Sequence, residues 1–268
     1  MTSPVSDAPA QRRAKAELRR IVLELRDSGR LYPLHDAELD DLFRGSMDRF
    51  CDIAERLEGH RRVLDIGSGH GMLLAVLAEL GHECAGVDFA DQANRYPFSY
   101  RDRAIPFAVS NAEVEPLPFR DASFDAVTCC QVLEHFSHSH LPLMREVLRV
   151  LRPGGVLEVD VPNAVSFRNR SRMLRGKHIT YDYREHYLHA EPIRYKGMSF
   201  FPARHNREFT RDDLRLLLQE AGFADIDVRF LKSRRYRTGL DRVRSLGTAL
   251  KDTVPSLRKS LIAFAVKP

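Results

Sequence analysis

The sequence contains no apolar run that approaches the roughly 20 residues needed to cross a bilayer as a helix. Its first ten residues are polar and include Pro4 and Pro9, so the apolar core of a secretory signal peptide is missing. No internal repeat and no low-complexity tract interrupts the chain. We therefore expect a cytoplasmic protein that does not span a membrane.

Cysteine is scarce, and its spacing excludes a structural zinc site. Of four cysteines, Cys51 and Cys84 are isolated and Cys129 and Cys130 are adjacent, so no C-x-x-C pair is available. We expect reduced thiols that behave as small apolar residues.

Positive charge is modest in sum but unevenly distributed. The formal net charge is +5. Residues 31–163 hold 12 Lys or Arg against 22 Asp or Glu, whereas residues 164–208 hold 10 against 4 and residues 209–268 hold 13 against 7. This asymmetry suggests that the later segments face something anionic. The alternative is that their Arg-rich loops are simply solvated.

The first half of the chain predicts an α/β domain of ordinary size. Residues 11–26 and 37–57 have apolar positions at helical spacing and predict two helices, within a helical cap of residues 1–60. Residues 61–163 then alternate between strand and helix patterns. The predicted strands are residues 62–66, 84–87, 105–109, 124–130 and 156–161, and the predicted helices include residues 72–80 and 141–151. Such alternation predicts a parallel, doubly wound sheet with helices on both faces.

Residues 164–208 interrupt this alternation with seven aromatic residues and four His among their ten cations. We predict an insertion that lies over the site as an acceptor-binding lid, since aromatic faces and Arg side chains bind apolar and anionic groups. A small packed subdomain is the alternative. Residues 209–268 predict the C-terminal part of the sheet. They comprise a helix at 211–221 with Thr210 as N-cap and Gly222 at its end, strands at 226–231 and 261–266, and a basic segment at 232–251.

A glycine turn follows the first predicted strand. Gly67, Ser68, Gly69 and Gly71 form a G-x-G-x-G spacing, which lets the backbone turn and approach a ligand closely. This spacing differs from the G-x-G-x-x-G that fits a pyrophosphate on a helix N-terminus. Asp65 precedes the turn, where a carboxylate can hold the ammonium of an amino-acid cofactor and would repel a diphosphate.

Two further segments predict a nucleoside site. Asp88 ends the second predicted strand, where a carboxylate can accept both hydroxyls of a ribose. Asn111 and Ala112 follow the third strand, where a polar side chain can reach the edge of an adenine. Phe89 can cover the face of that adenine.

These motifs, in this order, resemble the class I S-adenosylmethionine-dependent methyltransferases, in particular the group with a "type 11" methyltransferase domain. About 100 residues, from Val63 to Asn163, carry the resemblance. It implies S-adenosylmethionine as cofactor and a seven-stranded Rossmann-like sheet whose last strand is antiparallel. It also implies that Cys130 and Gln131, at the end of the fourth predicted strand, belong to the cofactor site.

A second resemblance starts at His205. The segment His205-Asn206-Arg207-Glu208-Phe209 is similar to a His-x-Arg-Glu-Phe stretch of bacterial members of this group, many of which methylate sugars, glycolipids or secondary metabolites. The same stretch also occurs with other acceptors.

Methyl transfer from a sulfonium needs alignment, and it needs a general base only when the acceptor is a neutral hydroxyl. The candidate bases are His135, which follows the fourth predicted strand, and His205. The alternatives are that His135 caps its helix and that His205 anchors the insertion. Gln131 to His135 also resembles the segment where ubiquinone-pathway O-methyltransferases hold a divalent ion. Gln131 takes the place of a glutamate there, and we therefore predict no metal.

We expect an O-methyltransferase for a small-molecule, glycosyl or lipid-linked acceptor, which the basic segments suggest is anionic. A nucleic-acid methyltransferase is the alternative, motivated by cations with interleaved aromatics. The sequence has no Asn/Asp-Pro-Pro-Tyr/Phe segment after the fourth strand, where many base N-methyltransferases have one. The intact glycine turn speaks against a non-catalytic scaffold, and its spacing speaks against a dehydrogenase.

Overall fold

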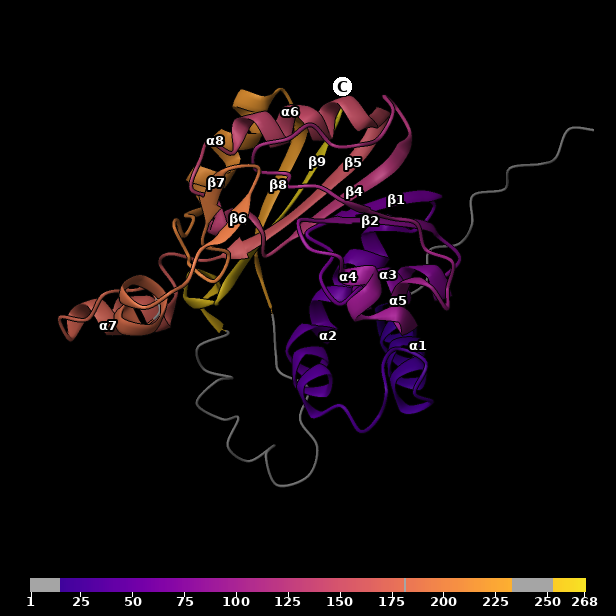
Figure 1. Ribbon diagram of the computed structural model, residues 1–268, viewed down its shortest axis with the longest axis horizontal. Coiled ribbons are helices and arrows are strands. Elements are labelled where there is room, and N and C mark those ends of the chain that lie inside the picture. The colour runs from indigo at the N-terminus through magenta and orange to yellow at the C-terminus, as the bar shows by residue number, and fades with distance from the viewer. Residues whose placement is uncertain (1–14, 181, 233–252) are drawn as a thin grey trace, which may run out of the picture.

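The computed structural model describes residues 15–180, 182–232 and 253–268. Seven strands form one sheet in the order β3-β2-β1-β4-β5-β9-β8 (Figure 1). The strands are β1 Arg62–Ile66, β2 Glu83–Asp88, β3 Phe107–Val109, β4 Phe124–Cys130, β5 Leu151–Pro162, β8 Ala224–Leu231 and β9 Ser260–Val266. The strands from β3 to β5 pair in parallel, and β9 runs antiparallel to both β5 and β8. The predicted α/β fold and its antiparallel last strand are confirmed.

Helices pack on both faces of the sheet, with one exception. The helices are α1 Lys15–Asp27, α2 Ala37–Leu57, α3 Met72–Glu79, α4 Gln92–Arg95, α5 Pro97–Tyr100, α6 Leu141–Val150, α7 Phe167–Leu174 and α8 Arg211–Ala221. The exception is α7, which extends away from the sheet (Figure 1). In β1, Val63 packs into the core with α1, α2 and α3, while Leu64 and Ile66 pack into the core with α6 and α8. Successive side chains of a strand point to opposite faces, so one short strand contributes to both cores.

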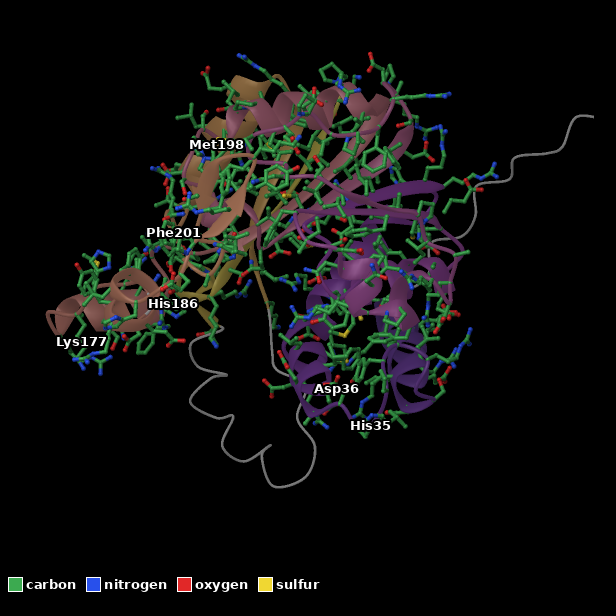
Figure 2. The ribbon with its side chains drawn as sticks, in the orientation of Figure 1. His35, Asp36, Lys177, His186, Met198 and Phe201 are labelled. Carbon is green, nitrogen blue, oxygen red and sulfur yellow. The ribbon has the colours of Figure 1, made fainter. Side chains whose placement is uncertain are left out.

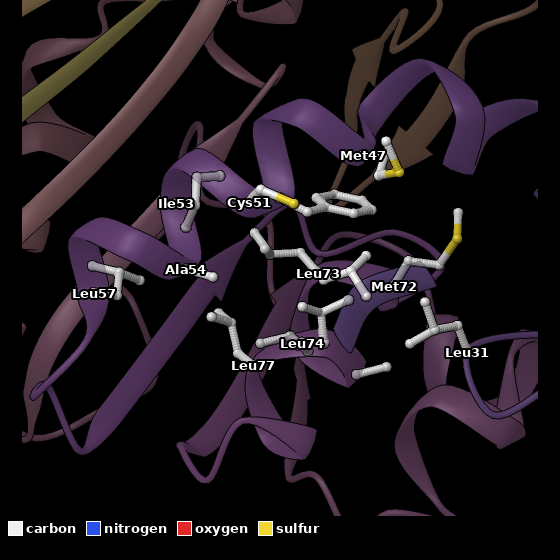
Figure 3. Packing of buried hydrophobic residues seen from close by; sticks show 14 of the residues in the cluster. Leu31, Met47, Cys51, Ile53, Ala54, Leu57, Met72, Leu73, Leu74 and Leu77 are labelled. Carbon is white, nitrogen blue, oxygen red and sulfur yellow. The ribbon is translucent and has the colours of Figure 1, made fainter. Parts of the chain in front are cut away.

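The N-terminal helices pack on the sheet domain through apolar side chains, as the helical spacing predicts. Cys51, Ala54 and Leu57 of α2 lie against Leu73 and Leu77 of α3 in the same buried cluster (Figure 3). Complete burial of an aliphatic side chain stabilises the fold by about 1.5–3 kcal/mol. The helices therefore form part of the main core.

The ends of several predicted elements shift. The third strand begins at Phe107 and not at residue 105, since Pro106 has no N–H for a ladder hydrogen bond. The fifth strand begins at Leu151 and not at residue 156, because the segment Arg152-Pro153-Gly154-Gly155 continues the strand through a register shift against β4. The predicted basic segment at 232–251 lies outside the described residues except for Lys232.

The last predicted helix is confirmed together with its caps. The Thr210 hydroxyl accepts a hydrogen bond from the Asp213 amide, and the Asp213 carboxylate accepts one from the Thr210 amide. This reciprocal capping satisfies two amides that a helix start leaves unpaired. Gly222 ends the helix with a left-handed φ of 101°.

The two ends of the insertion at 164–208 lie side by side at the sheet, where the Ala164 amide donates to the Phe209 carbonyl at 2.9 Å. It contains α7, a π-helical turn at Arg184–Leu188 and a hairpin of β6 Ile193–Tyr195 and β7 Met198–Phe200. Figure 1 shows α7 extending away from the body of the molecule. Among the described residues, no helix is both long enough and apolar enough to cross a membrane.

Candidate cofactor and acceptor site

The glycine turn lies directly against the loop that follows β4. Gly67, Gly69 and Gly71 have φ values of 68°, 49° and 72°, in the left-handed region that favours glycine. A Cβ at Gly67 would overlap with the Val132 side chain, and a Cβ at Gly71 would come within 2.9 Å of the Tyr100 ring. The turn therefore requires glycine for its backbone conformation and for its close packing.

Asp88 is held in one orientation at the end of β2. Its Oδ2 accepts the Gly69 amide at 3.0 Å, and its Oδ1 accepts the Ala90 amide at 3.3 Å. The side chain is buried, and this burial raises the pKa of its carboxyl. The hydrogen bond to Gly69 joins the two neighbouring sequence motifs, the glycine turn and the second-strand carboxylate.

A pocket of about 240 Å³ opens beside this pair. Of the residues predicted to bind the cofactor, five line it: Gly67, Asp88, Phe89, Asn111 and Gln131. It combines a bare glycine backbone, a carboxylate, an aromatic ring and an amide. These groups fit the sugar and base of a nucleoside.

The other predicted cofactor residues do not line this pocket, and each has a different neighbour. Asp65 is buried under the turn, accepts the Thr128 hydroxyl at 2.7 Å and has its pKa raised to about 7 by burial. Ser68 accepts the Tyr100 hydroxyl at 2.9 Å. The Cys130 thiol donates to Glu158 at 3.3 Å. Gly71 is the N-cap of α3, and Ala112 packs against the apolar core.

A second pocket, of about 270 Å³, is lined mainly by polar residues. Gln131 is the residue common to both pockets. Its φ of 55° is unusual for a residue other than glycine, and its Nε2 donates to Asp160 at 2.5 Å. Strained backbone of this kind costs about 1–3 kcal/mol and concentrates at functional positions. The second pocket also contains Asn163, Ser166, Arg168, Asn169, His205, Glu208 and Lys259.

The two candidate bases meet between the pockets. His135 lines the first pocket, His205 lines the second, and their ring centroids are 4.9 Å apart at an interplanar angle of 79°. His135 Nδ1 lies 2.9 Å from the Arg204 carbonyl, and burial lowers the pKa of this imidazole. His205 Nδ1 lies 3.6 Å from Glu208 Oε1. The contact with the Arg204 carbonyl orients the His135 ring, whereas the His205–Glu208 contact has ion-pair distance and is too long for a hydrogen bond.

Glu134 lies directly beside the histidine pair. It is fully buried, neither carboxylate oxygen has a hydrogen-bond partner among the described residues, and burial raises its pKa to about 8. Ligand atoms of Glu134, His135 and His205 lie within 4.8 Å of one another. Imidazole and carboxylate donors can bind a divalent cation. That no metal binds here stays a prediction, made because Gln131 takes the place of a glutamate.

Arg49 is a site residue that the sequence analysis missed. It comes from α2, and its Nη1 lies 3.1 Å from Asp160 Oδ1 at the end of β5. The Asp160 carboxylate also accepts Gln131, so Arg49 reaches the junction of the two pockets from the N-terminal helices. In the sequence Arg49 is one of many charged positions in an amphipathic helix, and no local signal separates it from the rest.

A seven-stranded sheet of this order, with a glycine turn, a second-strand carboxylate and a nucleoside-sized pocket at the carboxyl ends of its strands, defines the class I methyltransferase fold and cofactor site. The family profile described as "Methyltransferase domain" matches residues 11–228. The chain belongs to the class I S-adenosylmethionine-dependent methyltransferase family, whose methyl donor is S-adenosylmethionine.

Named relatives share about a third of their aligned residues with this chain. A probable S-adenosylmethionine-dependent methyltransferase of Mycobacterium tuberculosis is 31% identical over 166 residues, which cover 62% of this chain and 50% of that protein. The chain thus spans about half the length of this relative. The ubiquinone/menaquinone biosynthesis C-methyltransferase of Pseudomonas savastanoi is 33% identical over 207 residues, covering 69% of this chain and 75% of that protein.

Solved structures agree on the fold. A methyltransferase from Archaeoglobus fulgidus superposes with a TM-score of 0.54 at 18% identity, covering 87% of this chain and 100% of that one. A methyltransferase from Mesorhizobium loti superposes with a TM-score of 0.56 at 18% identity, covering 83% and 97%. At such identities the likeness concerns the architecture alone.

Proposed function

We propose that this protein transfers the methyl group of S-adenosylmethionine to a hydroxyl oxygen of a small-molecule, glycosyl or lipid-linked acceptor. The observation that carries the proposal is the meeting of two pockets at Gln131, with His135 on one side and His205 on the other. A donor in the first pocket and an acceptor in the second would approach each other across this junction.

The nucleoside side of the proposal rests on the first pocket. Asp88 would accept the ribose hydroxyls, Phe89 would cover the adenine, and Asn111 would contact its edge. The bound cofactor supplies an electrophilic methyl group on a sulfonium. The protein contributes alignment of the acceptor with that methyl group, which is the main requirement of an in-line displacement.

The acceptor side rests on His205 and its neighbours. A hydroxyl is a weak nucleophile and needs a base within hydrogen-bond reach. His205 lies in the polar pocket, with its Nδ1 3.6 Å from Glu208 Oε1, and is our candidate for this base. His135 fits the role of a neutral neighbour, since burial lowers its pKa.

The chemistry of the polar pocket supports an acceptor with hydroxyl and anionic groups. Arg168 and Lys259 offer positive charge, whereas the side-chain amides of Asn163 and Asn169 donate to backbone carbonyls of the pocket wall. Glu208 adds a carboxylate that suits sugar hydroxyls. This combination favours a glycosyl, phosphate-bearing or carboxylate-bearing group at the methylated end of the acceptor.

Carbon methylation is the second candidate, because the Pseudomonas relatives are named C-methyltransferases of quinone biosynthesis. The test is to incubate the protein with S-adenosylmethionine carrying a radioactive methyl group and fractionated extracts, and then to identify the labelled product by mass spectrometry and NMR. A methoxyl signal supports the proposal. A new C-methyl group, or label in RNA, overturns it. A protein with its cofactor site disabled by Asp88→Ala is the blank.

A further inference from the structure

Residues 164–180 form a purely cationic surface segment. It contains no Asp or Glu, and its five cations are Arg168, Arg170, Arg172, Arg175 and Lys177. Among the described residues none of the five is within ion-pair distance of a carboxylate; the hydrogen bonds of Arg170, Arg172 and Arg175 go to backbone carbonyls. These bonds orient the guanidinium groups but leave the positive charge of the segment uncompensated.

Two large apolar side chains stand among these cations. Met173 is 66% exposed and Leu174 is 89% exposed, the highest value for a large apolar side chain in the described part of the chain. Both lie in the last turn of α7, which extends away from the body of the molecule, and Lys177 lies near its outer tip (Figure 2). Adjacent exposed apolar side chains at a protruding tip are typical of an interaction surface.

The base of α7 is firmly attached to the protein. Asn169 is buried, and its side-chain amide donates to the carbonyls of Asn163 and Ala164 at 3.2 and 3.1 Å. Ser166 caps the helix by accepting the Asn169 amide. The exposed tip is therefore held out by an ordered helix and not by a loose loop.

We propose that α7 and the turn after it, residues 167–177, dock onto the surface of an anionic lipid bilayer. Met173 and Leu174 would enter the boundary between headgroups and acyl chains, and Arg170, Arg172, Arg175 and Lys177 would face lipid phosphates. Clusters of about 4–8 Lys or Arg next to exposed apolar residues are the usual pattern of such contacts. The proposal does not depend on which acceptor is methylated.

RNA is the other polyanion that such a charge would attract. Proteins that bind single strands stack the bases on aromatic rings between their cations. The tip of α7 instead presents aliphatic Met173 and Leu174, which cannot stack on a base but lose apolar surface to water when they enter a bilayer. The observations therefore favour a membrane surface.

Co-sedimentation of the full chain with lipid vesicles tests the proposal. We expect binding to vesicles of phosphatidylcholine mixed with phosphatidylglycerol, little binding to phosphatidylcholine alone, and weaker binding as salt rises. Because one cation near an anionic surface contributes about fivefold to partitioning, the double variant Arg170→Glu and Arg175→Glu should bind at least about 25-fold more weakly. The double variant Met173→Asp and Leu174→Asp should bind at least about tenfold more weakly.

Matched controls lie on other helices. Arg145→Glu on α6 and Leu216→Asp on α8 change the same kinds of exposed side chain and should bind as the wild type does. Circular dichroism and S-adenosylmethionine binding verify that every variant is folded. Equal binding to both vesicle types, or unchanged binding of both α7 variants, overturns the proposal. The proposal is also overturned if the chain binds neither vesicle type but does bind a single-stranded RNA oligonucleotide, and if the Arg170→Glu and Arg175→Glu variant binds that RNA more weakly.

Discussion

The imidazole rings of His135 and His205 meet edge to face, with 4.9 Å between their centroids. One ring belongs to the pocket that contains Asp88, and the other belongs to the polar pocket that contains Glu208. The two histidines come from opposite ends of the region between β4 and α8. Their contact links the pocket beside the glycine turn to the insertion at 164–208, which we propose to provide the acceptor side.

Substitution of His205 by Ala should lower kcat about 10²–10⁴-fold, as loss of a general base does, with S-adenosylmethionine affinity changed by less than about twofold. Radioactive methyl transfer to the identified acceptor measures the rate, and calorimetry measures the affinity. His35→Ala, at an exposed position far from both pockets, is the control (Figure 2). A His205→Ala variant that retains full kcat would remove His205 from the reaction.

Substitution of Asp88 by Ala should weaken S-adenosylmethionine binding at least about 100-fold. The variant loses two hydrogen bonds from ribose hydroxyls to a charged group, each contributing about 1.5–3 kcal/mol. It also frees the Gly69 amide that Asp88 now accepts. Isothermal titration calorimetry measures the change, with exposed Asp225→Ala as control. Unchanged affinity would place the ribose elsewhere.

Substitution of Gly67 by Ala should destabilise the protein. The new methyl group would overlap with Val132, and a residue other than glycine at a φ of 68° is strained by about 1–2 kcal/mol. Adding Val132→Ala removes the overlap but not the strain. The double variant should therefore recover part of the lost thermal stability in a denaturation scan, and no recovery would contradict the packing argument.

Glu134 should make the protein less stable as pH rises. Burial raises its pKa from 4.5 to about 8, so the folded protein binds this proton more tightly than the unfolded chain does. Its contribution is complete below the unfolded pKa and is lost as pH rises through the folded pKa. Glu134→Gln keeps a neutral side chain at every pH. Between about pH 6 and pH 9 it should lose less stability than the wild type, by up to about 3 kcal/mol.

Denaturant titrations at the two pH values measure this difference. Glu220→Gln, at an exposed position of α8, is the control and should follow the wild type. If the wild type and Glu134→Gln show the same pH dependence, Glu134 is ionised in the folded protein at neutral pH.

Methyl transfer should proceed without a divalent metal, as the amide at Gln131 predicts. Activity should therefore survive dialysis against EDTA within about twofold. Loss of activity that magnesium or zinc restores would contradict this prediction, and it would direct attention to the donor atoms of Glu134, His135 and His205. The Glu134→Gln variant would then show whether Glu134 binds the metal or acts only through its charge.

Short-range patterns in the sequence determined much of the fold. The mostly apolar runs at Arg62–Ile66 and Phe124–Cys130 have the bounds that the structure shows, because a strand buried on both faces consists largely of apolar residues. The glycine turn and Asp88 could also be predicted from the sequence, since each depends on the backbone of a few neighbouring residues. Strand ends were less readable at Pro106 and at Leu151, where pairing with a neighbouring strand decides the boundary.

Only the tertiary structure decided how the site is assembled. That Gln131 separates two pockets, that Arg49 reaches Asp160, and that His205 lies against His135 depend on contacts between segments far apart in the chain. No local periodicity records such contacts, because they follow from the path of the insertion and from where β5, β9 and α2 meet. Sequence specified which groups the protein can offer; packing specified which of them face one another.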